Sequence, residues 1–233
     1  MKFILASQSP RRKELLSRVV SDFDVRVSHV EEVVPASLQP QEVVMHLAKI
    51  KAEAVARELR LEQPAQRFAA IGADTVVVLD HQIMGKPKDH ADCVRMLSAL
   101  SGREHAVYTG VAVVVDGRTE SFYERTAVRF LQLSDEEINW YASLDEPYDK
   151  AGAYGIQGYG SLLVEGICGD YFNVMGLPVA SLRRRLLSLG VLSLPKAEKK
   201  TVKNWKRAAR RAALLGILDR ETANNQAALV QIS

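Results

Sequence analysis

Residues 105–131 read HAVYTGVAVVVDGRTESFYERTAVRFL, and this stretch decides the fold. It predicts one strand over residues 105–115 and a second over residues 118–131, with Asp116-Gly117 between them. Asp-Gly between two strand-like runs is a strong signal for a two-residue hairpin turn. We therefore expect a long antiparallel hairpin in the centre of a sheet.

Helices and strands alternate on both sides of this hairpin. Before it we expect a strand at 3–6, a helix at 10–19, a strand at 24–28, a helix at 41–59, a strand at 68–72 that ends at Asp74, a small hairpin of 75–79 with 82–84, and a helix at 89–100. After it we expect a helix capped by Ser134, a glycine-rich loop at 151–160, a strand at 162–167 and a helix at 178–189. This order predicts an α/β fold with a mixed sheet rather than a purely parallel one.

Composition places the chain among ordinary globular proteins. It has 233 residues, of which 47% are hydrophobic and 25% charged. Cys93 and Cys168 are the only cysteines and lack the spacing of zinc ligands, so neither a disulfide framework nor a structural zinc is predicted. No apolar run approaches the roughly 20 residues that span a bilayer, and the first residues lack a signal-peptide core. We expect a cytoplasmic protein without membrane contact.

The basic residues are concentrated at the C-terminal end. Residues 195–233 hold nine Lys or Arg against three Asp or Glu, a net charge of +6, which leaves residues 1–194 at −3. We therefore expect a catalytic body over 1–194 and a basic, partly helical extension over 195–233. Such a helix can meet nucleic acid, an anionic membrane surface or an acidic partner. The simpler alternative is a solvated extension or a helix packed against its own body or a sister chain.

The segment Ser7-Gln8-Ser9-Pro10-Arg11-Arg12-Lys13 places three cations at the start of a helix. Ser9 is the predicted N-cap and Pro10 the first helical residue. Free N–H groups and the helix dipole at this end favour an anion, so the cations are locally unfavourable unless a phosphate binds there. The alternative is that Arg11 and Arg12 point into water or pair with surface acids.

Asp74 follows an apolar run and is expected where a strand reaches the sheet edge, the usual place for ligands in open α/β sheets. Its carboxylate can bind a hard divalent cation or orient a water for attack on phosphorus. The alternative is an aspartate that caps a turn. Glu31 and Glu32 offer a second metal carboxylate, although paired acids in a loop are often only solvated.

Further candidate contacts to a phosphorylated ligand lie elsewhere in the chain. Lys51 and Lys86 offer point charges for phosphate oxygens, and the alternative for each is a surface lysine. Gln157 lies in a glycine-rich run whose backbone suits close approach to a ligand. Its amide can read the edge of a nucleobase or tie down its own loop.

Four separated motifs together resemble the Maf family, also called septum formation proteins. They are Leu5-Ala6-Ser7-Gln8-Ser9-Pro10-Arg11-Arg12, Gly72-Ala73-Asp74-Thr75-Val76-Val77, Gly85-Lys86-Pro87 and Asp149-Lys150-Ala151-Gly152-Ala153-Tyr154-Gly155-Ile156-Gln157-Gly158. Gly176-Leu177-Pro178 also matches, and the resemblance covers roughly residues 1–189. It implies an elongated mixed sheet flanked by helices, with two lobes around a cleft, similar to inosine triphosphate pyrophosphatases.

The resemblance also implies an activity: hydrolysis of a nucleoside triphosphate to the monophosphate and pyrophosphate with a divalent metal, Mg or Mn. Asp74 is then the catalytic acid-base carboxylate and a metal ligand, and Glu32 the second metal ligand. The implied phosphate contacts are Ser7, Arg12, Lys51 and Lys86. Whether Asp74 accepts a proton or chiefly holds the metal stays open.

The resemblance further assigns the chain to a branch of the family. Arg11, Thr75 and Gln157 match the branch that acts on dTTP and UTP, and it implies a homodimer. Two other functions remain: a nucleotide-binding regulator without significant turnover, whose basic tail engages nucleic acid or the division machinery, and an enzyme for purine or damaged nucleotides. Asp74, Lys51 and Lys86 together argue against the first, and the three branch positions argue against the second.

Overall fold

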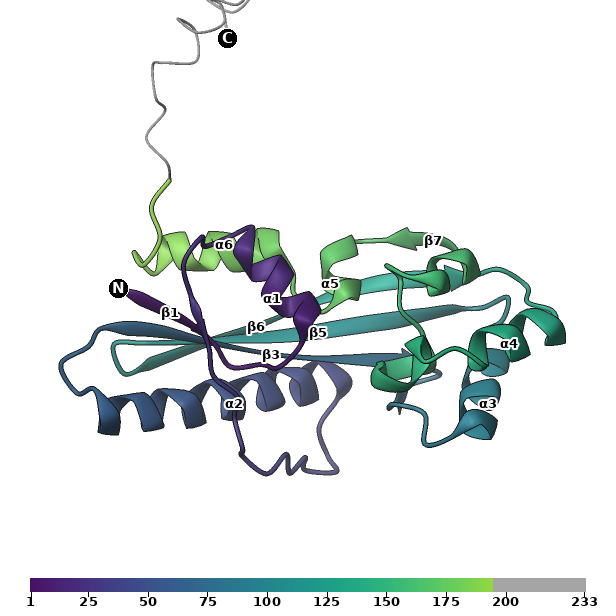
Figure 1. Cartoon of the computed structure of the whole chain (residues 1–233), viewed down its shortest axis with the longest axis horizontal. Coiled ribbons are helices and arrows are strands. Elements are labelled where there is room, and N and C mark those ends of the chain that lie inside the picture. Colours follow the sequence, from purple (N-terminus) through teal and green to yellow (C-terminus); the bar gives the residue numbers. More distant parts are fainter. Residues whose placement is uncertain (195–233) are drawn as a thin grey trace, which may run out of the picture. The chain divides into compact units, whose positions relative to one another are not determined.

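A seven-stranded mixed sheet forms the centre of the computed structural model, which describes residues 1–194 (Figure 1). The strands are β1 Lys2–Leu5, β2 Asp24–Val25, β3 Phe68–Leu79, β4 Gln82–Met84, β5 Glu104–Val115, β6 Arg118–Phe130 and β7 Val164–Cys168. Their order is β2-β1-β3-β5-β6-β7, and β4 pairs with β3 beside this path. The pairs of β1 with β2 and with β3 are parallel, and all the others are antiparallel. The predicted mixed α/β fold is confirmed.

Helices flank both faces of the sheet. They are α1 Pro10–Ser17, α2 Pro40–Glu62, α3 His90–Leu100, α4 Asp135–Ala142, α5 Tyr171–Met175 and α6 Val179–Ser188, with the short 3₁₀ turns η1 Glu146–Asp149, η2 Ala151–Ala153 and η3 Tyr159–Leu163. In Figure 1, α2 lies along one face of the sheet, and α1 and α6 lie on the opposite face. The predicted caps form: Ser9 accepts from the Arg12 N–H, and Ser134 makes a capping box with Glu137.

The two predicted hairpin turns are confirmed. Asp116 and Gly117 have φ of 48° and 82°, and Asp80 and His81 have φ of 49° and 64°. Positive φ at both central residues is the backbone of the turn whose twist matches that of paired strands. The resulting β5–β6 pairing is continuous from Val115–Arg118 to Glu104–Arg129.

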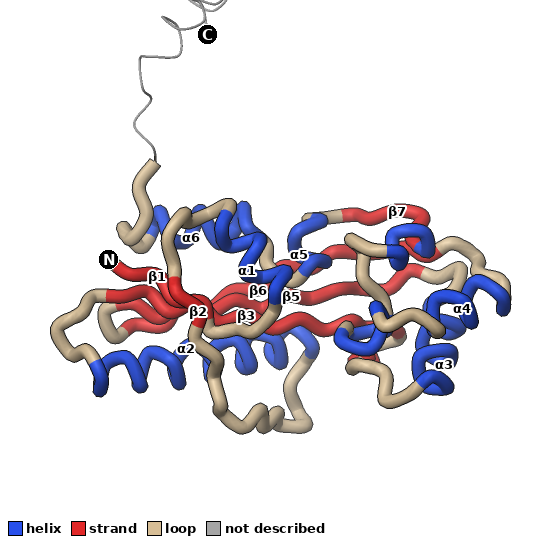
Figure 2. The backbone as a smooth tube through the Cα atoms, in the orientation of Figure 1, coloured by secondary structure: helices blue, strands red, loops and turns tan. Residues whose placement is uncertain are grey.

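The prediction that the strand beginning at Phe68 ends at Asp74 is wrong, because β3 runs without interruption to Leu79 (Figure 2). Its pairing with β5 is continuous through Asp74, which lies opposite Gly110. On its other side, however, β1 pairs only with residues 68–71 and β4 only with 77–79. Within the described chain, residues 72–76 therefore have no paired strand on this side. The expected sheet edge is this gap between β1 and β4, beside the middle of the continuous strand β3.

Side chains of β3 alternate between the two faces of the sheet. Ala70, Val76 and Val78 pack on the α2 side, whereas Ile71 and Val77 join the core on the other side. Helix α2 lies very close to the sheet, since a Cβ atom at Gly72 would stand 2.2 Å from the Ala48 carbonyl oxygen. Glycine is therefore needed there for the helix backbone to approach the strand.

Other predictions differ in detail. The strand expected at 24–28 is only two residues long, because β1 ends at Leu5 and offers its last carbonyl to the Arg26 N–H at 3.0 Å. Helix α5 and the 3₁₀ turns were not predicted. Among residues 1–194, no helix is both long and apolar enough to cross a membrane. The extension at 195–233 lies outside the described residues, so that domain assignment stays a prediction.

Candidate active site

A cleft of about 580 Å³ opens at the gap between β1 and β4. Asp74 and Thr75 line it, and they are the two half-buried residues of the otherwise buried strand β3. Because neighbouring strand residues point to opposite faces, Asp74 belongs to the α2 side and Thr75 to the α1 side. The gap lets one cleft reach both.

On the α2 side, three charged groups meet. The Lys51 Nζ atom lies 2.6 Å from Asp74 Oδ1 and 3.1 Å from Glu32 Oε1. The side chains of Lys51 and Asp74 are 14% and 15% exposed, whereas Glu32 is 52% exposed and comes from the loop before α2. The close approach of α2 at Gly72 brings Lys51 within reach of Asp74. Asp74 Oδ2 makes no hydrogen bond to residues 1–194 and is available to a ligand or a water.

On the α1 side, Arg12 is held by three oxygen acceptors. Its Nε donates to the Gly176 carbonyl at 3.0 Å, Nη1 to Ser7 Oγ at 3.4 Å and Nη2 to Thr75 Oγ1 at 3.1 Å. Burial lowers the pKa of the guanidinium from its usual value, and Asp74 opposes that shift. An arginine stays protonated in proteins, so Arg12 presents a fixed positive charge held by neutral partners.

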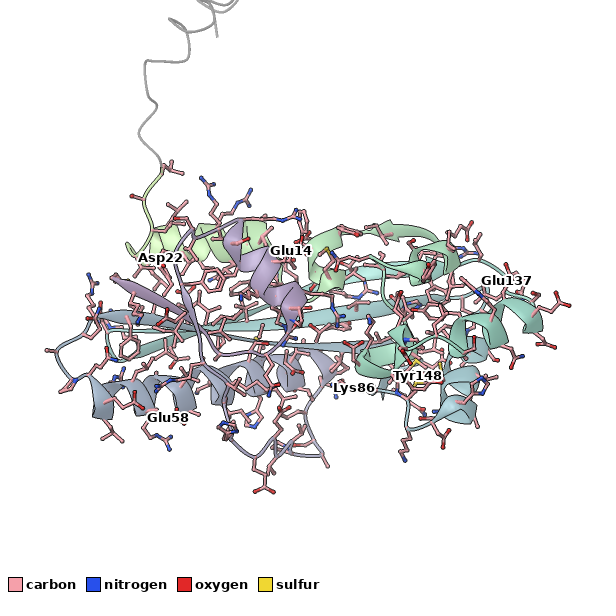
Figure 3. All side chains as sticks on the ribbon, in the orientation of Figure 1. Glu14, Asp22, Glu58, Lys86, Glu137 and Tyr148 are labelled. Atoms are coloured by element: carbon pink, nitrogen blue, oxygen red, sulfur yellow. The ribbon has the colours of Figure 1, made fainter. Side chains whose placement is uncertain are left out.

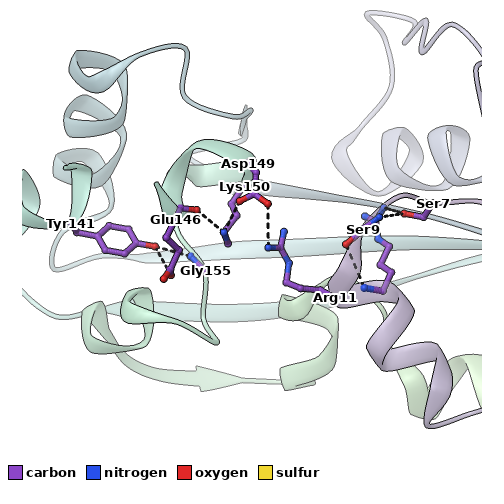
Figure 4. A network of polar contacts seen from close by, with 9 residues as sticks. Ser7, Ser9, Arg11, Tyr141, Glu146, Asp149, Lys150 and Gly155 are labelled. Atoms are coloured by element: carbon purple, nitrogen blue, oxygen red, sulfur yellow. Dashed lines mark hydrogen bonds and ion pairs between the residues drawn. The ribbon is translucent and has the colours of Figure 1, made fainter. Parts of the chain in front are cut away.

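The opposite wall of the cleft carries its own charged cluster, drawn in Figure 4. Asp149 Oδ1 lies 2.5 Å from Lys150 Nζ, and Asp149 Oδ2 lies 3.5 Å from Arg11 Nη1. Burial by itself would raise the pKa of Asp149, but Lys150, Arg11 and Lys86 lower it below its usual value. Arg11 therefore connects the start of α1 with this wall.

Glu146 fixes the glycine-rich loop that continues this wall. Its carboxylate accepts a hydrogen bond from Tyr141 Oη at 2.9 Å (Figure 4), and further bonds from the Tyr159 N–H at 3.0 Å and the Gly160 N–H at 3.1 Å. Tyr141 Oη in turn accepts from the Gly155 N–H at 3.0 Å. Burial raises the pKa of Tyr141 well above its usual range, so the phenol keeps its proton for Glu146.

Lys86 and Gln157 lie on the exposed rim of the cleft. The Gly152 N–H donates to the Gly85 carbonyl at 2.9 Å, and this bond ties the segment carrying Lys86 to the glycine-rich loop. A Cβ atom at Gly152 would lie 2.8 Å from Val77, so the loop rests directly on β3. Neither rim side chain pairs with another described residue, and both are free to meet a ligand; Figure 3 labels Lys86.

The structure brings nearly all of the predicted site residues to this cleft. Those that line it are Arg11, Arg12, Glu32, Lys51, Asp74, Thr75, Lys86 and Gln157. Ser7 does not line it, and instead accepts hydrogen bonds from Arg12 and from the Ser9 N–H at 3.2 Å. The individual roles of these residues stay predictions.

Sequence reasoning assigned no role to Glu146, Asp149, Lys150 or the Gly176 carbonyl, all of which line the cleft. Asp149 and Lys150 begin the fourth motif, so two charged residues next to a glycine-rich run were the signal in the sequence that could have marked them as site residues. Gly176 belongs to the matching Gly176-Leu177-Pro178 motif, whereas Glu146 gave no signal. In residues 1–194, no group of three or more His, Cys, Asp or Glu side chains is placed to hold a metal ion.

Comparisons with known proteins identify the family. The family described as "Maf-like protein" matches residues 2–189. A dTTP/UTP pyrophosphatase of Bacillus cytotoxicus is 51% identical over 185 residues, which cover 79% of this chain and 94% of that protein. A dTTP/UTP pyrophosphatase of Bacillus cereus strain Q1 is 48% identical over 190 residues, which cover 82% of this chain and 96% of that protein.

Among solved structures, the Ham1 protein of Staphylococcus aureus aligns with 81% of this chain and 100% of its own, at 15% identity and a TM-score of 0.45. The family match spans the sheet and every described side chain that lines the cleft. The chain belongs to the Maf-like protein family.

Proposed function

We propose that this protein hydrolyses dTTP and UTP between the α- and β-phosphates, releasing the nucleoside monophosphate and pyrophosphate, with help from a divalent cation. The chain is a nucleotide pyrophosphatase, as its curated relatives are. The choice of pyrimidine nucleotides and the need for a metal are the proposal. The observation that carries it is one cleft that presents Asp74 beside Lys51 and, across the strand, the Arg12 guanidinium.

Cations around the cleft suit a triphosphate. Arg11 and Arg12 offer guanidinium groups from the start of α1, Lys51 offers an ammonium group from α2, and Lys86 offers another from the rim. Positive groups placed where charge develops on the leaving pyrophosphate lower the barrier to its departure. Arg12 suits this role best, because its protein partners are uncharged and leave its charge for the substrate.

Asp74 is the group that we propose acts on the attacking water. Lys51 binds one of its oxygens, which orients the carboxylate, and the second oxygen can accept a hydrogen bond from water. A carboxylate in this position can accept a proton or hold a metal, and the two roles remain alternatives. Asp74 is required in both.

The residues present fit a hard divalent cation. Glu32 and Asp74 converge on the Lys51 ammonium, so this place already suits a positive charge. Magnesium is commonly held by one or two protein carboxylates together with waters and substrate phosphates, and these two side chains match that donor set. A bound metal would neutralise phosphate oxygens, while Lys51 would keep both carboxylates in position.

The preference for dTTP and UTP rests on the names of the relatives and on the three branch positions. Arg11 and Gln157 line the cleft that would receive the base, whereas the Thr75 hydroxyl is already bonded to Arg12. A homodimer and a cytoplasmic location remain predictions. A regulator without turnover is the second candidate, and no feature of the cleft favours it.

The test is pyrophosphate release from dTTP, UTP, CTP, GTP, ATP and ITP, with and without magnesium or manganese. We expect metal-dependent release that favours dTTP and UTP. Gln157→Ala should reduce the preference for pyrimidine over purine nucleotides, and the matched control Gln66→Ala, on an exposed loop outside the cleft, should leave it unchanged. No release from any nucleotide by folded protein would favour the regulator.

A further inference from the structure

A line of hydroxyl groups connects Arg12 to the interior of the protein. Arg12 Nη2 lies 3.1 Å from Thr75 Oγ1, which lies 3.0 Å from Thr109 Oγ1. Thr109 Oγ1 lies 2.8 Å from the Asn173 main-chain carbonyl oxygen. Thr75 and Thr109 are directly opposed on β3 and β5, and Thr109 is fully buried. A buried hydroxyl in a sheet core needs a reason, since an apolar residue of the same shape would fill the space.

The direction of every hydrogen bond in this line follows from chemistry. A carbonyl oxygen only accepts, so Thr109 uses its single proton on Asn173. Thr109 must then accept from Thr75, which uses its own single proton in doing so. Thr75 can therefore only accept from Arg12, as a guanidinium requires. All three bonds therefore point inward from the cleft. The Asn173 carbonyl also accepts from the Gly176 N–H at 3.0 Å, but reversing the bond between the threonines would leave the 2.8 Å contact of Thr109 Oγ1 with this carbonyl oxygen without a proton.

The inner end of the line is fixed in place. Asn173 is fully buried, and its Nδ2 atom donates to the Val107 carbonyl at 3.0 Å and to Thr126 Oγ1 at 2.9 Å. These bonds hold α5 against β5 and β6. The residue that follows α5, Gly176, offers its own carbonyl to Arg12 Nε. The α5 segment thus holds the guanidinium twice, once directly and once through the two threonines.

We propose that Thr109 is a positioning residue that, through Thr75, fixes the direction of the Arg12 guanidinium toward the phosphates of the substrate. This inference rests on the proposed function in giving Arg12 a phosphate partner. It adds that the Thr75 hydroxyl has no proton left for a ligand, so Thr75 meets a substrate only as an acceptor. Neutral acceptors are the right supports, because a carboxylate in their place would compensate the charge that the phosphate needs.

The test compares Thr109→Val, which keeps the shape and removes the hydroxyl, with Thr109→Ser, which keeps the hydroxyl and removes a methyl group. We expect Thr109→Val to lower kcat/KM for dTTP by up to about tenfold, the upper end of the scale for one hydrogen bond between neutral groups. Thr109→Ser should stay within about threefold of the wild type despite its smaller side chain. Urea unfolding of each variant tests whether the fold persists.

A double-mutant cycle separates positioning from general damage. In an Arg12→Lys background, the line of hydroxyl groups no longer holds a guanidinium. Thr109→Val should therefore lower kcat/KM by almost nothing further. Equal losses in both backgrounds would overturn the proposal, as would wild-type kinetics in Thr109→Val. If Thr109→Val does not fold, Thr75→Val interrupts the same line at a half-buried position and takes its place in the cycle.

Binding of inorganic tripolyphosphate, measured by calorimetry, keeps this test independent of turnover. Thr109→Val should weaken that binding by up to about tenfold, and Thr109→Ser should not. Should the wild type hydrolyse no nucleotide, the proposed function fails while this comparison still decides the role of Thr109. Unchanged tripolyphosphate binding in Thr109→Val would refute the positioning role even in an active enzyme.

Discussion

The two faces of β3 carry opposite charge where they reach the cleft. On the α2 face, one ammonium, that of Lys51, meets two carboxylates, those of Asp74 and Glu32. On the α1 face, the Arg12 guanidinium meets only hydroxyl and carbonyl oxygens. One face has negative charge in excess and the other positive charge. The α2 face suits a metal ion and the α1 face suits a polyphosphate, although both faces are formed by neighbouring residues of one strand.

This contrast depends on a gap in the sheet. The side chains of adjacent strand residues normally point to opposite faces of a continuous sheet, so a single ligand cannot contact both. Because β1 stops at Leu5 and β4 begins to pair only at Val77, Asp74 and Thr75 both border open space.

The largest effect is expected at Asp74. Asp74→Asn should lower kcat for dTTP by roughly 100- to 10,000-fold, the range for loss of a catalytic acid or base. The fold should persist, because the amide is nearly isosteric. Asp116→Asn, at the tip of the β5–β6 hairpin and outside the cleft, is the matched control and should retain wild-type turnover. Substantial activity in Asp74→Asn would remove its catalytic assignment.

On the other face, Arg12→Lys should lower kcat/KM by roughly 10- to 100-fold. A lysine keeps the charge but cannot bond Ser7, Thr75 and Gly176 in a planar arrangement. Arg18→Lys, on an exposed arginine that follows the same helix and pairs with Glu14, provides the control. Steady-state kinetics on dTTP measure both variants, and an Arg12→Lys enzyme equal to the control would show that geometry at this face is unimportant.

Glu32→Gln tests the excess of negative charge on the α2 face. Loss of one carboxylate should raise the magnesium concentration needed for half-maximal activity by about tenfold while maximal turnover changes less. Its neighbour Glu31 makes no ion pair with a described residue, so Glu31→Gln is the matched control. An unchanged magnesium requirement in Glu32→Gln would mean that the metal is held elsewhere.

The smallest effect on turnover is expected at His105, which lies on β5 on the same face as Thr109 but away from Arg12. Its Nε2 contacts Tyr154 Oη at 2.8 Å, and burial lowers the pKa of His105 from 6.5 to about 4. As the pH falls, His105 therefore binds a proton in the unfolded chain before it does so in the folded protein. The free energy of unfolding falls as the pH drops from about 6.5 to about 4.

His105→Gln should remove up to about 2–3 kcal/mol of this pH-dependent loss, a figure that follows from the pKa shift. Urea unfolding at pH 7 and pH 4.5 measures it, with the exposed His90→Gln as control. An equally steep pH dependence in His105→Gln would assign the acid sensitivity to other groups.

Local signals predicted much of the fold. Ser9-Pro10 starts α1 and Asp116-Gly117 closes the main hairpin, because caps and tight turns depend on nearby residues. The course of β3 was predicted wrongly, since the charge of Asp74 suggests a strand end and only pairing with β5 keeps the strand continuous. Helix α5 was not predicted, because five residues are too few to show the hydrophobic periodicity of a helix.

The site was predicted unevenly for a related reason. Charged residues in motifs, such as Asp74 and Lys86, stand out in the sequence and do line the cleft. Thr109 resembles any threonine in a strand, and its bond to Asn173 joins residues that are 64 positions apart. Glu146 likewise acts through backbone N–H groups of a distant loop. Contacts of this kind depend on the folded chain and leave no local pattern.

The most direct test of the account is the identity of the products that wild-type protein forms from dTTP and magnesium, followed by phosphorus NMR. We predict dTMP and pyrophosphate in equal amounts, without dTDP or inorganic phosphate. Formation of dTDP and phosphate would show attack at the terminal phosphate and contradict the assigned reaction. Unchanged dTTP, with the protein folded, would contradict turnover itself.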